Sequence, residues 1–376
     1  MNIETKCVHA GEGADTITKG LNTPIFPSSA HEYLDAEDLA YPRYFNTFNQ
    51  KVIVRKICEL EKAEDGILFS SGMAAISTVL FSFLKAGDHI ILQDEIYGGS
   101  HAFVEEFFER FGISYSFVAT NAGAIESAIR PETRIIFIET PTNPLLSIVD
   151  IKEVAETAKR NKCITVIDNT FATPINQNPV KLGIDIVIHS GTKYLGGHSD
   201  LSCGAAVTTL DLASKIRKTA TNFGGNLNAL TCYILERSLK TLSVRVKQQN
   251  ENAFQTAKFL NHHSAVKNVY YPGLSDHPGH AVACDQMNGF GAMLSFELND
   301  SNLSADNFMR KLSLVKPAVS LGGIETTICD PARTSHAKIS PRVRARQGIT
   351  DSLLRLSVGI ENVEDLIKDI DQALEI

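Results

Sequence analysis

The sequence lacks several features that would define other classes of protein. No apolar run reaches the roughly 20 residues of a membrane-spanning helix, and the first residues lack the charged-then-apolar pattern of a secretion signal. The net charge is −7, so there is no basic excess to attract a nucleic acid. Repeats and low-complexity segments are missing as well. We therefore expect neither a membrane protein nor a nucleic-acid-binding protein.

Cysteine is sparse, and its pattern excludes two common roles. The seven cysteines are scattered, odd in number and without a CxxC pair, which favours free thiols in a reducing cytoplasm over disulfides or structural zinc. Histidines at positions 262, 263, 277 and 280 lack the carboxylate partners and the HExxH frame of a metallohydrolase. We therefore expect a cytoplasmic protein without a bound metal.

Composition and periodicity predict two folded domains and an N-terminal arm. The chain has 376 residues, of which 43% are hydrophobic and 21% charged, an ordinary globular composition. Residues 1–45 contain three prolines and little periodicity, so we expect an extended arm that lies on a neighbouring subunit. Residues 46–240 predict a ligand-binding α/β domain, and residues 241–376 predict a smaller α+β domain.

Short apolar runs alternate with helical patterns in the first of these domains. We expect helices such as 51–60, 101–111 and 151–160, a long helix over 226–259 that a break could interrupt, and strands at 66–69, 89–92, 114–118, 135–139, 164–168, 184–188 and 204–208. This alternation indicates a mostly parallel sheet with helices on both faces. Ligands of such sheets bind beyond the carboxyl ends of the strands. In the second domain we expect strands near 269–271, 292–297 and 354–358, and helices near 304–314 and 363–374.

One lysine follows a predicted strand and lies among small residues. Lys193 comes after the apolar run 184–188 in the stretch His189-Ser190-Gly191-Thr192-Lys193-Tyr194, where a turn would bring its amine close to a ligand. Lysine amines held in this way form Schiff bases with carbonyls such as pyridoxal 5′-phosphate (PLP). Ser190 and Thr192 offer hydroxyl groups to a phosphate. Taken alone, however, the string is more typical of an ordinary surface turn.

Further signals fall at the ends of other predicted strands, and each suits a part of PLP. Gly72 and Met73 begin a predicted helix, where free N–H groups favour a phosphate. Tyr97 could stack on a pyridine ring and transfer a proton. Asp168 could keep the ring nitrogen protonated, and Asn143 could contact the ring hydroxyl. A helix cap or a turn would explain each of these residues about equally well by itself.

Two spatial arguments connect these signals. Asp168 and Lys193 belong to successive strands, so both side chains could reach one cleft, as PLP chemistry requires. In the second domain, the planar guanidinium of Arg355 is suited to bind the α-carboxylate of an amino acid. A structural ion pair would be the simpler explanation of Arg355 alone.

Together and in this order, the motifs resemble the Cys/Met-metabolism (trans-sulfuration) family of PLP-dependent enzymes. That family includes cystathionine γ-synthase, cystathionine β- and γ-lyases, methionine γ-lyase and homoserine sulfhydrylases. The resemblance covers nearly the whole chain and is most specific at Ser190–Tyr194 followed by Gly197–Asp200. It also rests on segments 5–11, 41–43, 71–75, 139–144, 168–171, 271–274, 320–323 and 355–359.

The resemblance implies a type I PLP fold, a homotetramer built from two tight dimers, and roles for individual residues. Lys193 would hold the cofactor and shuttle protons, Asp168 would pair with the ring nitrogen, and Tyr97 would stack on the ring as an acid or base. The residues that would hold the phosphate are Gly72, Met73, Ser190 and Thr192, with Tyr41 and Arg43 reaching in from the partner subunit. Asn143 and Thr170 would complete the cofactor site, and the substrate would be bound by Asn143, Val319, Ser320 and Arg355.

Departures from the family pattern bear on the substrate. After Tyr41-Pro42-Arg43 the family usually has Asn-Pro-Thr, whereas this chain has Asn46-Thr47-Phe48, so the entry of the arm into the site is in doubt. Typical methionine γ-lyases carry a cysteine at the position of Gly99. The glycine in this chain matches the cystathionine enzymes instead. Val319 replaces a glutamate that γ-enzymes acting on cystathionine tend to carry, and an apolar side chain suits an uncharged end such as a methylthio group. Gly99 therefore favours cystathionine as the substrate, whereas Val319 favours a substrate with an uncharged end.

We therefore predict a PLP-dependent carbon–sulfur lyase of sulfur amino-acid metabolism. It would act by γ-elimination on methionine- or cystathionine-like substrates and release a 2-oxo acid, ammonia and a thiol. The alternatives are γ-replacement on an acyl-homoserine, as in cystathionine γ-synthase or homoserine sulfhydrylase, and the reaction of a cystathionine β-lyase. A catalytically silent protein with this fold is an alternative of another class, against which the joint presence of Lys193, Asp168, Tyr97 and Arg355 argues.

Overall fold

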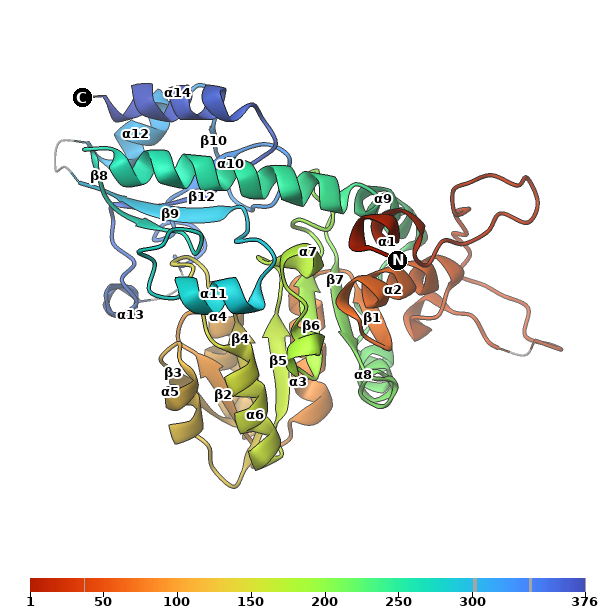
Figure 1. Cartoon of the computed structure of the whole chain (residues 1–376). Coiled ribbons are helices and arrows are strands. Elements are labelled where there is room, and N and C mark those ends of the chain that lie inside the picture. Colours follow the sequence, from red (N-terminus) through yellow and green to blue (C-terminus); the bar gives the residue numbers. More distant parts are fainter. Residues whose placement is uncertain (37, 300–302, 338–339, 376) are drawn as a thin grey trace.

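Two β-sheets, connected by one long helix, organise the chain (Figure 1). The computed structural model describes residues 1–36, 38–299, 303–337 and 340–375. Within these ranges the larger sheet has seven strands in the order β1-β7-β6-β5-β4-β2-β3, and the smaller has five in the order β10-β11-β12-β9-β8. None of the helices in the described ranges is both long and apolar enough to cross a membrane.

The larger sheet is mostly parallel, as the sequence predicts. Its strands are β1 (Asp65–Phe69), β2 (His89–Gln93), β3 (Ser114–Val118), β4 (Thr133–Glu139), β5 (Ile164–Asp168), β6 (Ile186–Ser190) and β7 (Gly204–Thr208). Strands β3, β2, β4, β5 and β6 pair in parallel, and β7 runs antiparallel to both of its neighbours. The carboxyl ends of β4, β5 and β6 therefore meet at one edge, where ligands of such sheets bind.

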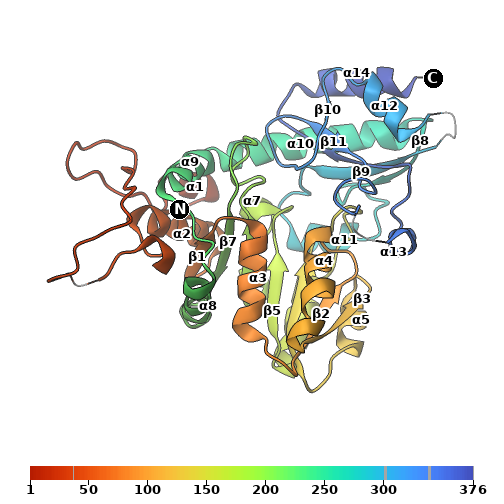
Figure 2. The same ribbon diagram turned by 180° about the vertical axis from the view of Figure 1, so that it is seen from behind.

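Helices cover both faces of this sheet because its strands are apolar on both sides. Successive residues of β4 alternate between two cores: Ile136 and Ile138 pack in one, and Ile135 and Phe137 in the other. The first core includes residues of α2 (Phe48–Glu61), α5 (Ala122–Ser127) and α6 (Ile151–Asn161). The second core includes residues of α3 (Gly72–Phe83), α4 (Gly98–Phe107) and α8 (Leu210–Phe223). Figure 1 shows α6 in front of the sheet, and Figure 2 shows α3 and α4 on the opposite face.

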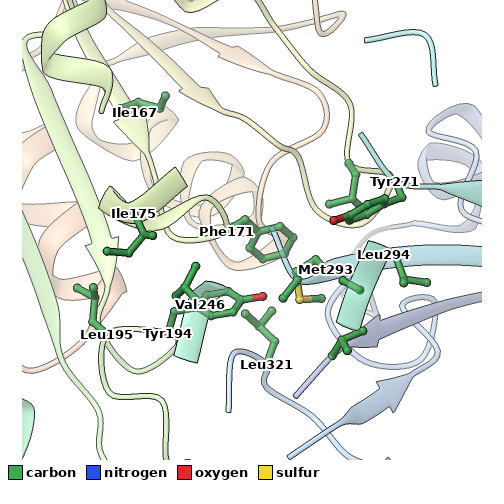
Figure 3. Packing of buried hydrophobic residues seen from close by; sticks show 14 of the residues in the cluster. Ile167, Phe171, Ile175, Tyr194, Leu195, Val246, Tyr271, Met293, Leu294 and Leu321 are labelled. Carbon is green, nitrogen blue, oxygen red and sulfur yellow. The ribbon is translucent and has the colours of Figure 1, made fainter. Parts of the chain in front are cut away.

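The second domain packs helices against one antiparallel sheet. Helices α9 (Ala229–Leu239) and α10 (Leu242–His262) lead into it, and its strands are β8 (Val266–Tyr270), β9 (Met293–Leu298), β10 (Lys316–Pro317), β11 (Thr327–Cys329) and β12 (Leu353–Ser357). Its helices are α11 (His280–Gln286), α12 (Ala305–Lys311), α13 (Pro341–Arg346) and α14 (Val363–Leu374). One apolar cluster spans both domains: Figure 3 shows Phe171, Val246 and Leu294 gathered in it.

Most predicted elements are confirmed, and some are corrected. Strands β3, β5 and β7 have the predicted bounds, and the predicted long helix is broken between α9 and α10. Strand β6 begins and ends two residues later than predicted, so Ser190 is its last residue. The predicted helix at 101–111 begins earlier, at Gly98, and gives way after Phe107 to a 3₁₀ turn. Helix α8 has an amphipathic pattern that the sequence reading missed.

The N-terminal segment is not extended throughout, because it begins with a helix. Helix α1 (Ile3–His9) packs on α2 and α10. The buried Lys56 of α2 donates from Nζ to the backbone oxygens of Cys7 and Val8, at 3.1 Å each, and so satisfies carbonyl groups at the end of α1. Further along, the buried Thr23 anchors the segment to the body by donating from its hydroxyl to Glu236 Oε1 at 2.9 Å, and stretches on either side of it loop away (Figure 1).

A buried polar contact ties α2 to the ends of β5 and β6. The fully buried Oε1 of Glu61 accepts a hydrogen bond from Asn169 Nδ2 at 2.7 Å and lies 2.6 Å from His189 Nε2. Asn169 directly follows the last residue of β5, and His189 lies in β6. One carboxylate thereby fixes the two strand ends that carry the residues described below.

Glu61→Ala should destabilise the fold strongly, because it leaves two buried polar side chains without their acceptor. We expect the free energy of unfolding in urea, followed by circular dichroism, to fall by about 3–5 kcal/mol. Glu59→Ala is the matched control on the same helix, since Glu59 makes only a surface ion pair with Lys6, at 2.8 Å. The control should lose less than about 1 kcal/mol. Equal losses in the two variants would contradict the proposed role of the buried contact.

Candidate active site

A cavity of about 590 Å³ lies where the strand ends of the large sheet face the second domain. The first domain lines it with Ser71, Gly72, Met73, Ile76, Tyr97, Glu139, Asn143, Asp168, Thr170, Phe171, Ser190, Thr192 and Lys193. The second domain contributes Val319, Ser320, Leu321, Arg333, Thr334, Ser335 and Arg355. The structure therefore brings together all of the predicted site residues except Tyr41 and Arg43.

Lys193 occupies a turn just beyond β6. Its backbone N–H donates to the Ser190 oxygen at 3.1 Å, and its oxygen accepts from Gly197 N–H at 2.7 Å. Its Nζ donates to Ser320 Oγ at 2.8 Å. Burial, and secondarily the positive charge of Arg355, lowers the pKa of the amine to about 8, although Asp168 opposes this shift. A substantial fraction of the amine is therefore neutral, and so nucleophilic, at mildly alkaline pH.

Asp168 ends β5 as a buried carboxyl group. Its Oδ1 accepts a hydrogen bond from Thr170 N–H at 3.0 Å. Burial raises its pKa, while the contacts with Thr170 and the nearby His189 and Lys193 act in the opposite direction. A buried carboxylate needs a cationic partner to remain charged. A protonated pyridine nitrogen would supply that partner.

A second buried carboxyl group lies beside the first. Glu139 ends β4 and stands opposite Asp168 in the register of the two strands. Burial, and then the neighbouring Asp168, raises the pKa of Glu139 well above its usual value. Its Oε2 accepts from the backbone N–H of Tyr97 at 2.8 Å, so Glu139 positions the turn that carries the half-exposed tyrosine.

Another group of lining residues offers donors suited to a phosphate. Ser71 caps α3 by accepting from Ala74 N–H at 3.1 Å, and the N–H groups of Gly72 and Met73 belong to the first turn, which lacks intrahelical acceptors. A side chain at Gly72 would place its Cβ 2.8 Å from the Ser190 Cβ, so glycine is needed for this close approach. Hydroxyl groups of Ser190 and Thr192 line the same wall. Such a set of donors at a helix start fits a phosphate.

Arg355 projects from β12 into the cavity and is 4% exposed. One Nη donates to Asn143 Oδ1 at 2.8 Å, and the other lies 3.4 Å from the Ser320 oxygen. Its buried Nε has no acceptor among the described residues, and an unpaired buried donor of this kind fits a carboxylate ligand. Ser320 holds a left-handed backbone, with φ 77°, of the strained kind that gathers at functional sites.

Sequence reasoning missed part of this wall. Glu139 ends an apolar strand just as Asp168 does, and that shared pattern could have identified it. Phe171 and Leu321 look like ordinary core residues in the sequence. Arg333, Thr334 and Ser335 lie in an irregular turn after β11, where the sequence has no periodic pattern of apolar residues.

Tyr41 and Arg43 lie away from the cavity of their own chain. Arg43 donates from Nη1 to the Thr221 oxygen at 2.7 Å, and its guanidinium lies over the rings of Tyr41 and Tyr44, at 5.7 and 5.8 Å. Their contribution to a neighbouring subunit stays a prediction.

Comparison with known proteins agrees with this geometry. A family model described as "Cys/Met metabolism PLP-dependent enzyme" matches residues 4–375. A cystathionine beta-lyase of Lactococcus lactis subsp. cremoris (strain MG1363) is 43% identical, over 100% of this chain and 99% of that protein. An L-methionine gamma-lyase of Fusobacterium nucleatum subsp. nucleatum is 41% identical, over 99% of this chain and 97% of that protein.

A solved structure gives the same result in three dimensions. The crystal structure of cystathionine gamma-lyase from Lactobacillus plantarum complexed with L-serine has a TM-score of 0.96 to this chain and 38% sequence identity, covering 99% of this chain and 98% of the other. The type I PLP fold is thereby confirmed, and the cofactor implied by the family is pyridoxal 5′-phosphate. The chain belongs to the family of Cys/Met metabolism PLP-dependent enzymes.

Proposed function

We propose that this enzyme breaks the carbon–sulfur bond of cystathionine- or methionine-like amino acids by γ-elimination and releases a 2-oxo acid, ammonia and a thiol. The family and the names of its relatives identify a PLP-dependent carbon–sulfur lyase, so the proposal concerns the substrate and the bond that is broken. The observation that carries it is one cavity that holds the amine of Lys193, the buried carboxyl of Asp168 and the guanidinium of Arg355.

The chain's residues would divide the work of the reaction. When bound, PLP supplies an aldehyde that links to amino groups and a ring that delocalises the electron pair left by a departing proton. Asp168 would pair with the ring nitrogen and keep it protonated, and Gly72, Met73, Ser190, Thr192 and Thr170 would line the cofactor's phosphate end. Arg355 would bind the substrate α-carboxylate with its unpaired Nε.

Lys193 is suited to move protons at two carbons. With its pKa lowered to about 8, the amine can accept and release a proton near neutral pH. It would take the proton from Cα, give that proton up at another atom of the bound cofactor and so become neutral again, and then take one from Cβ, after which the γ-sulfur would leave. The phenol of Tyr97, 41% exposed at the cavity wall, would protonate the departing thiolate.

Two further features belong to the proposal. A homotetramer with shared active sites would bring Tyr41 and Arg43 to the phosphate of a partner subunit, and the exposed arm supports this, since Ile17, Leu21 and Leu34 are more than 70% exposed in the single chain. A cytoplasmic location is supported by the cysteines, which are all free in the structure.

Product identification tests the reaction. Cystathionine incubated with the holoenzyme and no added thiol should yield cysteine, 2-oxobutanoate and ammonia, because γ-elimination breaks the bond between Cγ and sulfur. Pyruvate with homocysteine would instead indicate β-elimination. Consumption of an acyl-homoserine with cysteine, combined with inertness towards both cystathionine and methionine, would refute the lyase proposal and favour γ-replacement. Mass spectrometry of the quenched mixture distinguishes the three outcomes.

Arg355→Ala should impair substrate use more than folding. Loss of the carboxylate contact should raise KM and lower kcat/KM by a factor equivalent to about 2–5 kcal/mol. Arg346→Ala is the control, since Arg346 makes an exposed ion pair with Asp94 at 3.2 Å and does not line the cavity. Unchanged kcat/KM in Arg355→Ala would remove Arg355 from the substrate site.

Cofactor uptake by the apoenzyme should depend on pH through Lys193. Only the neutral amine attacks an aldehyde, so the uptake rate should rise with a midpoint near pH 8 instead of the usual 10.5. Arg355→Ala removes a charge that lowers this pKa and should move the midpoint up, whereas Asp168→Asn should move it down. Stopped-flow absorbance of the covalent complex gives the rates. Midpoints that stay fixed in both variants would contradict the electrostatic assignment.

A further inference from the structure

The cavity contains a second arginine to which the proposed reaction assigns no role. Arg333 lies in the turn after β11, and its side chain is 67% exposed although it lines the cavity. Strand β11 pairs with β12, so that Cys329 stands opposite Arg355. Strand β12 thus carries the buried arginine inside the cavity, and the turn that follows the neighbouring β11 carries the exposed arginine at its rim.

Two carboxylates hold Arg333 in place. Its Nε lies 3.3 Å from Asp330 Oδ2, and its Nη1 donates to Asp306 Oδ1 at 2.9 Å. Asp330 is itself fixed, since its Oδ1 accepts from Ala332 N–H at 2.8 Å and its carboxyl is 5% exposed. The Nη2 nitrogen of Arg333 has no acidic partner among the described residues. The guanidinium is therefore oriented from two sides and keeps donors for a further carboxylate.

The exposed residues that line the cavity have mixed chemistry. Val319 is 71% exposed and lines the same cavity, which gives the substrate chain an apolar border. Considered alone, Val319 favours an uncharged substrate end. Arg333 adds to that rim a guanidinium whose charge is offset by Asp306 and Asp330 but whose Nη2 has no acidic partner among the described residues, and the proposed reaction already uses the buried Arg355 for the α-carboxylate.

We propose that Arg333 binds a second carboxylate at the far end of the substrate, so that the cavity selects thioether amino acids with a carboxyl group at both ends over those that end in an alkyl group. This inference rests on the proposed lyase function and specifies its substrate class. The thioether chain would extend from the Lys193 end of the cavity, past Val319, to the rim. Arg333 acts as a specificity residue and takes no part in the proton transfers.

The inference is tested in the holoenzyme by comparing cystathionine, which has a carboxyl group at both ends, with methionine, which does not. Arg333→Ala should lower kcat/KM for cystathionine about 10- to 100-fold, mainly through KM, because a charge-assisted contact is lost. Its kcat/KM for methionine, which ends in a methyl group, should stay within about twofold of the wild-type value. Arg333→Lys should recover part of the cystathionine activity, since it restores the charge without the planar fork.

Arg310→Ala is the matched control for charge near the rim. Arg310 lies 3.7 Å from the same Asp306, is 78% exposed and does not line the cavity. It should leave both substrates unaffected. Equal losses on cystathionine and methionine in Arg333→Ala, or no loss on cystathionine, would overturn the proposal, and thermal denaturation with cofactor content checks that the variant is folded and loaded.

Binding is measured alongside turnover, so that failure of the two proposals can be told apart. Titration of wild-type and Arg333→Ala holoenzyme with each amino acid, followed by cofactor absorbance, gives dissociation constants without requiring cleavage. A wild-type enzyme that binds but cleaves neither substrate would refute the lyase proposal alone. In that case a selective loss of cystathionine binding in Arg333→Ala would still support the rim site, and unchanged binding would refute it.

Discussion

The structure depends on a carboxyl group and an amine that line one cavity and are both shielded from solvent by burial. Asp168 and Lys193 both lose solvation there, and each charge partly compensates the other. Neither group would be stable at such depth without defined partners. The parallel strands position both groups, because β5 and β6 are neighbours whose carboxyl ends lie side by side. The buried Glu61 of α2 contacts Asn169 and His189 at these two strand ends.

In the proposed site, the groups assigned to the chemistry come from one domain and those assigned to the substrate come from two. Strand ends of the large sheet provide the amine, the carboxyl groups and the phosphate donors. Arg355 and Ser320 come from the second domain, yet Arg355 is held by Asn143 of the first, at 2.8 Å. The similarity to whole chains of lyases fits this arrangement, since a fragment containing either domain alone would lack residues that line the cavity.

Most of the large sheet and most of the candidate site could be predicted from the sequence, because the patterns that indicate them lie within short stretches of the chain. Apolar runs such as 164–168 define strands with their correct bounds, and a residue just beyond a strand end must face the ligand edge. Asp168 and Lys193 are predictable for this reason, since each lies at or shortly after the end of a predicted strand. The contact of Glu61 with His189 joins residues 128 positions apart, and Arg333 lies in an irregular turn. No local pattern encodes either, because tertiary packing alone brings such groups together.

The apolar cluster that spans both domains has a mechanical consequence. Residues from β5, α10 and β9 pack in one continuous core, so swinging the second domain away from the first would expose that core to water at a cost that grows with the area uncovered. A hinge motion that parts the two domains would therefore be a costly way to admit or release an amino acid. The exposed side chains of Tyr97 and Arg333, which line the cavity outside that core, can move without uncovering it.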